Sequence, residues 1–218
     1  MFDLLMKSSL KQNNPITKEQ VATLLHFCWC NAHDLYEEAR ILKEHKKYAR
    51  CFFLCVLALE ELAKIPIATN ALYLSNTDIQ AWKGFWKTFN SHTSKQDAAR
   101  CYGQGILKII NAERWTKYYK NKIPVNLPLN QLKLASMYVD CYDGVALRPN
   151  KIFGTEEGSV SSIFEVVKDR LEGYSDLHST IDKSINFVRS TVELSVKIDG
   201  LDAREVIVSE FRKRSKSK

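Results

Sequence analysis

The chain has 218 residues, of which 45% are apolar and 26% charged, enough to form one soluble domain without a stabilising metal or disulfide. With only eight Gly and five Pro, a turn-rich all-β fold is excluded. The amino terminus lacks the features of a signal peptide, and no apolar run is long enough to span a membrane. These properties favour a cytoplasmic protein with no membrane partner.

The first two predicted helices follow closely on each other. Thr17 and Gln20 form a capping box that begins a long amphipathic helix. A lysine pair at 46–47 marks a short turn before the second helix. Pro66 is expected to kink this helix or to end it near Ile65.

Helical periodicity continues through the rest of the chain. Asp78 is predicted to cap a third helix, whose aromatic stripe is expected to lie in the core: Trp82, Phe85, Trp86 and Phe89. Helical character is expected from 91 to 110, then a loop at 123–128 and a short helix at 130–137. The pattern predicts an all-α fold, an antiparallel bundle of long helices.

The last third of the chain contributes additional C-terminal helices. Residues 144–158 are expected to be irregular, and 159–172 helical. The next helix is predicted from an apolar stripe: Leu177, Ile181, Ile185, Val188, Val192 and Val196. Asp202 is predicted to cap the last helix. The whole chain is therefore predicted to consist of an extension at 1–16, one helical domain at 17–211 and a basic tail at 212–218.

The chain carries no recognisable cofactor or metal motif. None of its six cysteines has the C-x-x-C spacing of zinc or redox sites, so free reduced thiols are expected. There is no phosphate-binding glycine loop and no Rossmann fingerprint.

Positive charge is concentrated at the carboxyl end. The net charge is +7, and residues 212–218 contain five basic side chains. Such a tail can bind nucleic-acid phosphates by counterion release, or it can be a frayed and solvated terminus.

Charged residues inside an apolar helix form the first candidate site. The segment 48–64 is apolar almost all round, which indicates a central helix, yet Glu60, Glu61 and Lys64 lie within one helical turn. Buried charges need partners, so these residues are candidates for a buried ionic cluster. In the alternative interpretation, Glu60 and Lys64 form an ordinary exposed i,i+4 ion pair.

Two further short motifs carry polar side chains. His92 and Lys95 lie three residues apart, so they share a face if the segment is helical. A histidine there could act as general acid or base while the lysine binds a phosphate, or both could be structural. Asp140 follows Tyr138-Val139, where an isolated Asp is usually a cap or turn former.

Taken together, three segments resemble the AbiV family of abortive-infection proteins, which belongs to the HEPN superfamily of helical domains. They are 32–64 with its Glu60-Glu61-Leu62-Ala63-Lys64 end, 89–95 around His92, and 137–144 around Tyr138-Val139-Asp140. The resemblance covers about residues 20–150. It implies a HEPN-type bundle and a bacterial toxin that stops phage multiplication by arresting the infected cell, at the level of RNA or translation.

The resemblance also suggests a mechanism, from which this chain partly departs. HEPN relatives are commonly dimeric, metal-independent ribonucleases that use an arginine and a nearby histidine late in the bundle. Here the only match to that spacing is Arg40 with His45, at the end of the first helix. The residues that carry over from the narrower family are Glu60, Glu61, Lys64, His92, Lys95, Tyr138 and Asp140.

Two mechanisms are open for such a protein. In the first it is a ribonuclease in which His92 is the acid or base, Lys95 and Lys64 bind phosphate, and Glu61 completes the catalytic set. In the second it is a non-catalytic binding protein that engages a phage or host protein, and Glu60, Tyr138 and Asp140 form a binding or structural polar cluster. A homodimer, a phage-encoded activator and RNA are the expected partners, with no cofactor and no metal.

Overall fold

The computed structural model describes residues 14–92, 94–95, 133–134, 136–142, 145–149, 157–193, 197–198 and 201–216. Its helices are α2 (Lys18–Glu44), α3 (Tyr48–Thr69), η1 (Asn70–Tyr73), α4 (Ile79–Asn90), α10 (Glu157–His178), α11 (Ile181–Glu193) and α12 (Ala203–Lys216). Two short hairpins, β1 (Asp140–Tyr142) with β2 (Val145–Leu147) and β3 (Lys197–Ile198) with β4 (Leu201–Asp202), complete the described fold. The protein is therefore all-α in class, as predicted.

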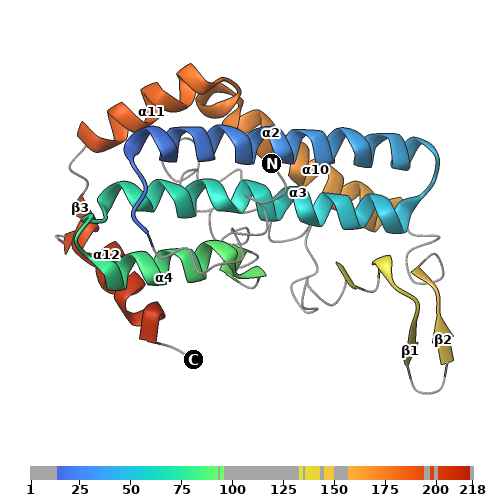
Figure 1. Ribbon diagram of the computed structural model, residues 1–218. Helices are drawn as coiled ribbons and strands as arrows, with labels where there is room; N and C mark the ends of the chain where they lie inside the picture. Colours follow the sequence, from blue (N-terminus) through green and yellow to red (C-terminus); the bar gives the residue numbers. More distant parts are fainter. Residues whose placement is uncertain are drawn as a thin grey trace, which may run out of the picture.

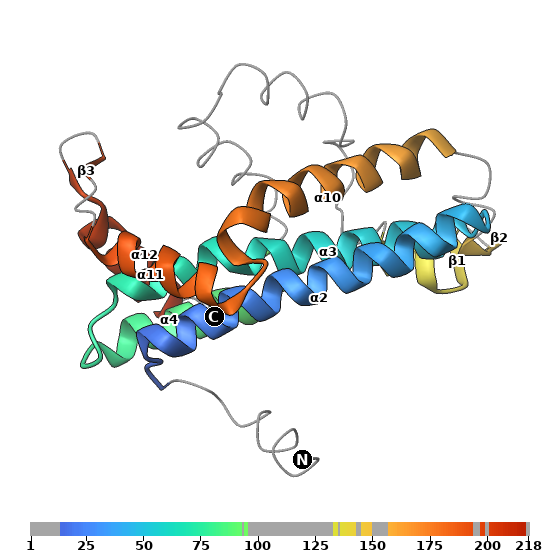
Figure 2. The ribbon, with the colours of Figure 1, turned by 90° about the horizontal axis from the view of Figure 1, so that it is seen from above.

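Helix α3 is the centre of the molecule. It lies antiparallel to α2, with α10 packed against both and α4 on its other side (Figure 1). Helix α11 covers the first half of α2, and α12 packs on α4. Figure 2 shows the same layers from above, with the β1–β2 hairpin at the end where α2 passes into α3. The apolar segment 48–64 therefore forms the central helix that its sequence predicts.

The expected start signals of the first and third helices are confirmed. Thr17 and Gln20 bond reciprocally in a capping box, and the Asp78 carboxylate accepts the backbone N–H of Ala81 at 3.0 Å. The four aromatic residues of α4 are all buried, and Phe85 packs edge-on against Trp82, Trp86 and Phe211.

Pro66 was expected to kink the second helix or to end it near Ile65, and the second of these alternatives is wrong. Helix α3 continues through Pro66 to Thr69. Proline removes the backbone hydrogen bond to the residue four positions earlier, and its ring crowds that residue's carbonyl. Ile65, Ile67 and Ala68 on either side are buried, at 1%, 5% and 0% exposure, so tertiary packing keeps this last turn helical.

The predicted boundaries in the last third also need correction. Part of 144–158 is regular, because β2 (145–147) pairs antiparallel with β1. Leu177 belongs to α10, so the predicted stripe spans two helices. Thr180 separates them: its hydroxyl accepts the backbone N–H of Lys183 at 3.2 Å and caps α11. The predicted loop at 123–128 and most of 91–110 lie outside the described residues.

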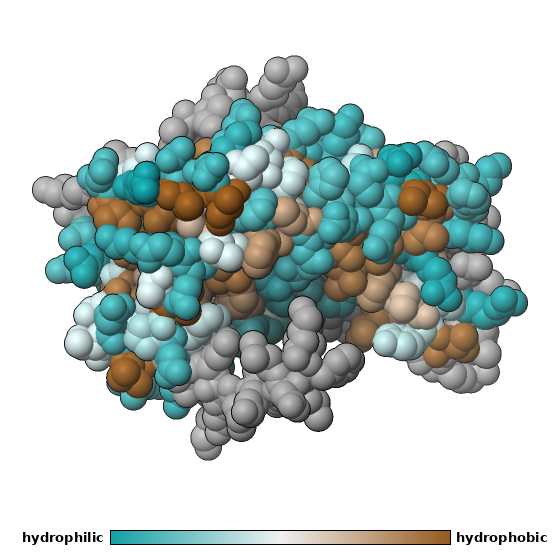
Figure 3. All heavy atoms as spheres, turned by 45° about the horizontal axis from the view of Figure 1, so that its top comes forward, coloured by the Kyte–Doolittle hydropathy of each residue, from teal (hydrophilic) through white to brown (hydrophobic). Residues whose placement is uncertain are grey.

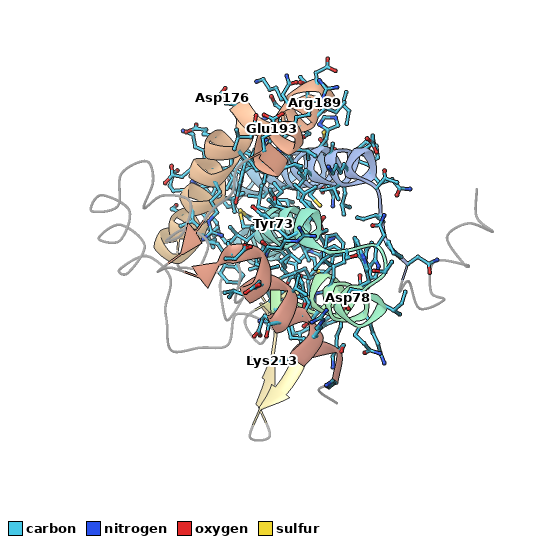
Figure 4. The ribbon with its side chains drawn as sticks, turned by 90° about the vertical axis from the view of Figure 1, so that its left-hand side faces the viewer. Tyr73, Asp78, Asp176, Arg189, Glu193 and Lys213 are labelled. Carbon is cyan, nitrogen blue, oxygen red and sulfur yellow. The ribbon has the colours of Figure 1, made fainter. Side chains whose placement is uncertain are left out.

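The basic carboxyl end is not a frayed tail. Helix α12 continues to Lys216, past the expected boundary at 212. Arg212 donates from Nε and Nη2 to the Asp78 carboxylate at 2.8 and 2.7 Å, and Asp202 caps the helix as predicted. Figure 4 shows α12 lying beside α4, with Asp78 at the start of α4 and Lys213 toward the free end of α12.

On the face shown in Figure 3, the apolar areas are broken up by polar ones. Within the described residues, no helix combines the length and apolarity needed to cross a bilayer.

Close packing of α4 on α12 depends on Gly84. A Cβ atom at this position would overlap with the backbone carbonyl of Phe211, and overpacking of this kind costs about 1–3 kcal/mol. We therefore predict that Gly84→Ala lowers the free energy of unfolding by that amount in urea denaturation. The control is Gly173→Ala in α10, where no heavy atom lies within 4 Å and Ala should stabilise by about 0.5–1 kcal/mol. Equal effects of the two substitutions would contradict this packing.

A buried histidine makes folding sensitive to acid. The His178 side chain is fully buried, with Nδ1 at 3.1 Å from the Ser184 hydroxyl. Burial, with a smaller contribution from His26, lowers the pKa of His178 from 6.5 to about 4. Between these values the unfolded chain binds a proton that the folded protein does not.

Acidification should therefore destabilise the fold in a defined window. Stability attributable to His178 is complete above pH 6.5 and decreases by about 3 kcal/mol as the pH falls to 4. We expect His178→Phe to show a shallower decrease of unfolding free energy over this range, whatever its stability at neutral pH. Parallel curves for the two proteins would show that His178 titrates normally in the fold.

Candidate functional site

The carboxylate of Glu60 is the centre of the candidate site. Only 2% of this residue is exposed. Its Oε1 accepts a hydrogen bond from Lys133 Nζ at 2.8 Å, its Oε2 lies 2.7 Å from His92 Nδ1, and Lys95 Nζ lies 4.0 Å from Oε2. We call Glu60, His92, Lys95 and Lys133 the Glu60 cluster.

The alternative of an exposed Glu60–Lys64 pair is wrong. Lys64 instead binds Glu61 at 2.6 Å, and the two side chains are only 19% and 17% exposed. The Lys64 ammonium also lies 5.5 Å from the centre of the Phe89 ring, on α4. This pair therefore joins α3 to α4 beside the Glu60 cluster.

A serine positions both His92 and Lys95. Helix α4 ends at Asn90 because Ser91 takes an extended conformation. The Ser91 hydroxyl then accepts the backbone N–H of Ser94 at 3.1 Å, and its carbonyl accepts that of Lys95 at 3.1 Å. Ser91 thus caps a new helical turn, and the i,i+3 spacing places His92 and Lys95 on the side that faces Glu60.

Lys133 was not recognised in the sequence. Its side chain is 7% exposed and contacts Glu60 from a segment 73 residues further along the chain. One signal was available, since Lys133 is the only charged residue between Pro128 and Asp140. A lysine within a short apolar helix needs a buried counter-charge, but the sequence does not say which carboxylate supplies it.

Charge complementarity determines how His92 is oriented. Two ammonium groups within 4.0 Å favour the ionised form of Glu60, and an ionised carboxylate only accepts hydrogen bonds. His92 Nδ1 is therefore the donor, so the 3.5 Å approach of Lys133 Nζ to this nitrogen is a contact between two donors. In the neutral imidazole the lone pair is then on Nε2. The His92 side chain is 61% exposed, whereas that of Glu60 is 3% exposed.

Burial also changes the chemistry of two neighbours. It lowers the pKa of Lys95, and the positive charge of Lys64 adds to this effect, while Glu60 opposes it. Burial, together with Glu61, raises the pKa of the Cys28 thiol to about 12. Cys28 is therefore a protonated core residue and not a nucleophile.

The structure brings together five of the seven residues singled out in the sequence. Glu60, Glu61, Lys64, His92 and Lys95 gather on α3 and just after α4. Tyr138 does not join them through its hydroxyl: it is 61% exposed, and its side chain makes no hydrogen bond within the described part of the chain. Asp140 begins β1, and its side chain lies outside the described residues.

The arginine–histidine spacing of the superfamily is not part of this site. Arg40 binds Glu37 and Glu44 on its own helix at 2.9 and 2.6 Å. His45 Nδ1 lies 2.9 Å from the carbonyl of Ile41, and both side chains are exposed at the end of α2. Arg40 and His45 therefore make local interactions on the surface at the end of α2.

Four of the six cysteines lie in the described part of the chain. Cys28, Cys30, Cys51 and Cys55 are free thiols, as predicted. Among the residues that the structure describes, no three His, Cys, Asp or Glu side chains gather as a metal site would require.

The antiparallel bundle, with a buried ionic cluster joining its central helix to α4, defines an all-α helical domain. The HEPN family model described as AbiV matches residues 20–172, well over half of the chain and further than the resemblance at about 20–150. The chain belongs to the AbiV family, and this membership implies a role in abortive-infection defence against phage. Searches of curated proteins and of solved structures each gave no significant match.

Removing the central carboxylate should weaken the fold strongly. Glu60→Gln would leave Lys95 and Lys133 buried without their counter-charge, at a cost of about 3–5 kcal/mol in unfolding free energy. Glu61→Gln is the control, because Lys64 reaches water more easily and its loss should cost about 1 kcal/mol or less. Urea denaturation of both variants measures the difference. Similar small losses in the two would show that water already solvates the Glu60 carboxylate.

Proposed function

We propose that this protein is a phage-defence effector that arrests the infected cell by cleaving RNA without a metal ion. The observation that carries the proposal is the hydrogen bond between Glu60 and His92, in which a buried carboxylate orients an exposed imidazole. A carboxylate on Nδ1 keeps the lone pair on Nε2, which is the arrangement a general base needs.

The proposed reaction is an internal transesterification. His92 Nε2 takes the proton of a ribose 2′-hydroxyl, and the resulting oxygen attacks the adjacent phosphorus. The bond from phosphorus to the 5′-oxygen breaks, and the leaving oxygen takes a proton from water. The hydroxide left behind takes the proton from His92, which returns the imidazole to its neutral form. The products are a 2′,3′-cyclic phosphate and a 5′-hydroxyl end, and no oxidant or metal is required.

The neighbouring side chains have separate roles in this proposal. Lys95 and Lys64 stabilise the negative charge that develops on the phosphate oxygens. Lys64 is the more exposed of the two, at 19% against 8%. Glu61 holds Lys64 in place, and Glu60 and Lys133 act as positioning residues for His92.

One observation favours a second function, a non-catalytic effector that engages a phage or host protein. Lys133 and Lys64 are already paired with Glu60 and Glu61, so the network is largely neutralised without any ligand. Such a network can fix the packing of helices without doing chemistry. The absence of the superfamily's arginine–histidine pair from the site supports the same alternative.

The cellular setting is also part of the proposal. We infer that the protein acts in the cytoplasm as a homodimer, and that a phage-encoded protein activates it. The division into an extension at 1–16, a domain at 17–211 and a basic end at 212–218 remains a prediction, with α12 continuing through the second boundary.

A cleavage assay tests the ribonuclease. Wild-type and His92→Ala proteins are incubated with total cellular RNA, with chelator, and with or without phage lysate. We expect the wild type alone to cleave, in the presence of chelator, and His92→Ala to lose both cleavage and growth arrest. Because His92 is exposed, its removal should change unfolding free energy by less than about 1 kcal/mol.

His45→Ala is the matched control, since His45 is an exposed histidine in the only arginine–histidine spacing of superfamily type. It should retain full activity. Loss of cleavage in His45→Ala with retention in His92→Ala would move the active site to the end of α2. Intact RNA in every sample, with a phage protein bound to the wild type, would favour the non-catalytic effector.

A further inference from the structure

Positively charged side chains gather where the last turns of α12 lie against α4. The segments 79–92 and 211–216 contain no Asp or Glu, and each of their lysines and arginines is exposed: Lys83, Lys87, Arg212, Lys213, Arg214 and Lys216. We call these six residues the α4–α12 basic face. The whole chain has a net charge of +7, so much of its positive excess is concentrated here.

A contact between the two helices shows that they present these charges together. The Ser215 hydroxyl donates to Gln80 Oε1 at 3.2 Å. Lys83 and Lys87 follow Gln80 at i+3 and i+7, so they lie on the face of α4 that Ser215 touches. Figure 4 shows Lys213 on the same end of α12, beside α4. The last turn of α12 therefore adjoins the lysine-bearing face of α4.

The fold neutralises only part of this charge. The two arginines of the α4–α12 basic face form ion pairs with Asp78 and Glu210, at 2.7 and 3.0 Å. Lys83, Lys213 and Lys216 form no ion pair with any residue that the structure describes. Exposed cations that are gathered on one surface create a positive potential, which attracts polyanions.

The α4–α12 basic face also lies on the element that carries the proposed catalytic histidine. Helix α4 ends at Asn90, and His92 is the second residue after it. At a rise of about 1.5 Å per residue, Lys83 is about 10 Å along the helix axis from Asn90, and Lys87 lies between them. The cations of α4 and the proposed general base are therefore held by one helix and the cap at its end.

We propose that the α4–α12 basic face binds the phosphate backbone of the RNA substrate and holds the strand for His92. This inference rests on the proposed ribonuclease function and adds to it the surface that binds the substrate. Lysine and arginine bind nucleic-acid phosphates by releasing condensed counterions, so the affinity falls as the salt concentration rises. Because contacts to phosphates carry no sequence information, this face binds RNA without regard to sequence.

The test measures RNA affinity and its dependence on salt. A fluorescein-labelled single-stranded RNA is titrated with His92→Ala protein, so that cleavage does not interfere, and with the same protein carrying Lys83→Gln, Lys213→Gln and Lys216→Gln together. Loss of three phosphate contacts should weaken binding roughly ten- to a hundredfold at about 0.1 M salt, and it should lower the slope of log affinity against log salt by about two. Two RNAs of unrelated sequence should show the same loss.

Two controls separate this surface from net charge and from side-chain length. Lys46→Gln, Lys47→Gln and Arg50→Gln together remove three exposed charges at the α2–α3 turn, at the opposite end of the bundle (Figure 1). These changes should weaken binding less than about threefold, because salt screens distant charges. Replacing the three lysines of the test variant by arginine keeps the charge and should retain both the affinity and the salt slope.

Kinetics separates this inference from the function on which it rests. With His92 present, the three Lys→Gln substitutions should raise KM for RNA cleavage and leave kcat unchanged. Cleavage that requires His92 but has an unchanged KM in this variant would leave the ribonuclease in place and overturn only the RNA-binding face. Neither binding nor cleavage of RNA by the wild type would overturn both proposals.

Two further outcomes would also overturn the RNA-binding face. Equal losses of affinity in the two sets of Lys/Arg→Gln substitutions would show that RNA responds to net charge alone. The α4–α12 basic face would instead be a membrane-binding surface if phosphatidylglycerol vesicles bound the wild type and not the Lys83, Lys213 and Lys216 variant, with RNA affinity unchanged between the two.

Discussion

The buried carboxylate of Glu60 requires positively charged partners, and these partners come from distant parts of the chain. Glu60 sits on the central helix with 2% of its surface exposed, where an unpaired charge would cost several kcal/mol. Its partners come from the turn after α4 and from residue 133. The constraint therefore joins three segments that are far apart in the sequence, and the histidine is the most exposed member of the cluster.

The same constraint separates the roles of the charged residues. Lys133 is almost as buried as Glu60 and lies 2.8 Å from it, so its positive charge mainly balances the carboxylate. His92 is anchored at one nitrogen and exposed at its other edge, which is how an imidazole is held for proton transfer. Loss of a buried partner from the Glu60 cluster would be costly in free energy. The complete cluster therefore stabilises the packing and also holds the His92 imidazole in position to react.

Local polar groups make this geometry possible. Ser91 ends α4 and caps the next turn with its own hydroxyl and carbonyl, so His92 and Lys95 are turned toward α3. At the opposite edge of α4, Gly84 allows the backbone of α12 to approach closely. Helix α4 is thereby held between α3 and α12, and the position of His92 relative to Glu60 follows from that packing.

Local and periodic features were predictable from the sequence, because they depend on neighbours within about one helical turn. The capping box at Thr17, the Asp78 cap, the aromatic core of α4 and the buried charges of α3 are of this kind. The five clustered residues were singled out by the charges within an apolar helix, by the i,i+3 spacing of His92 and Lys95, and by the family resemblance.

Only the tertiary structure determined which charged side chains pair with each other. Glu60 binds His92 and Lys133 in preference to Lys64, Lys133 enters from 73 residues away, and α3 continues past Pro66. Likewise, most of the basic end belongs to helix α12, in which Arg212 forms an ion pair with Asp78. Each of these outcomes depends on desolvation and packing between segments distant in sequence, and periodicity along the chain contains no information about which segments meet.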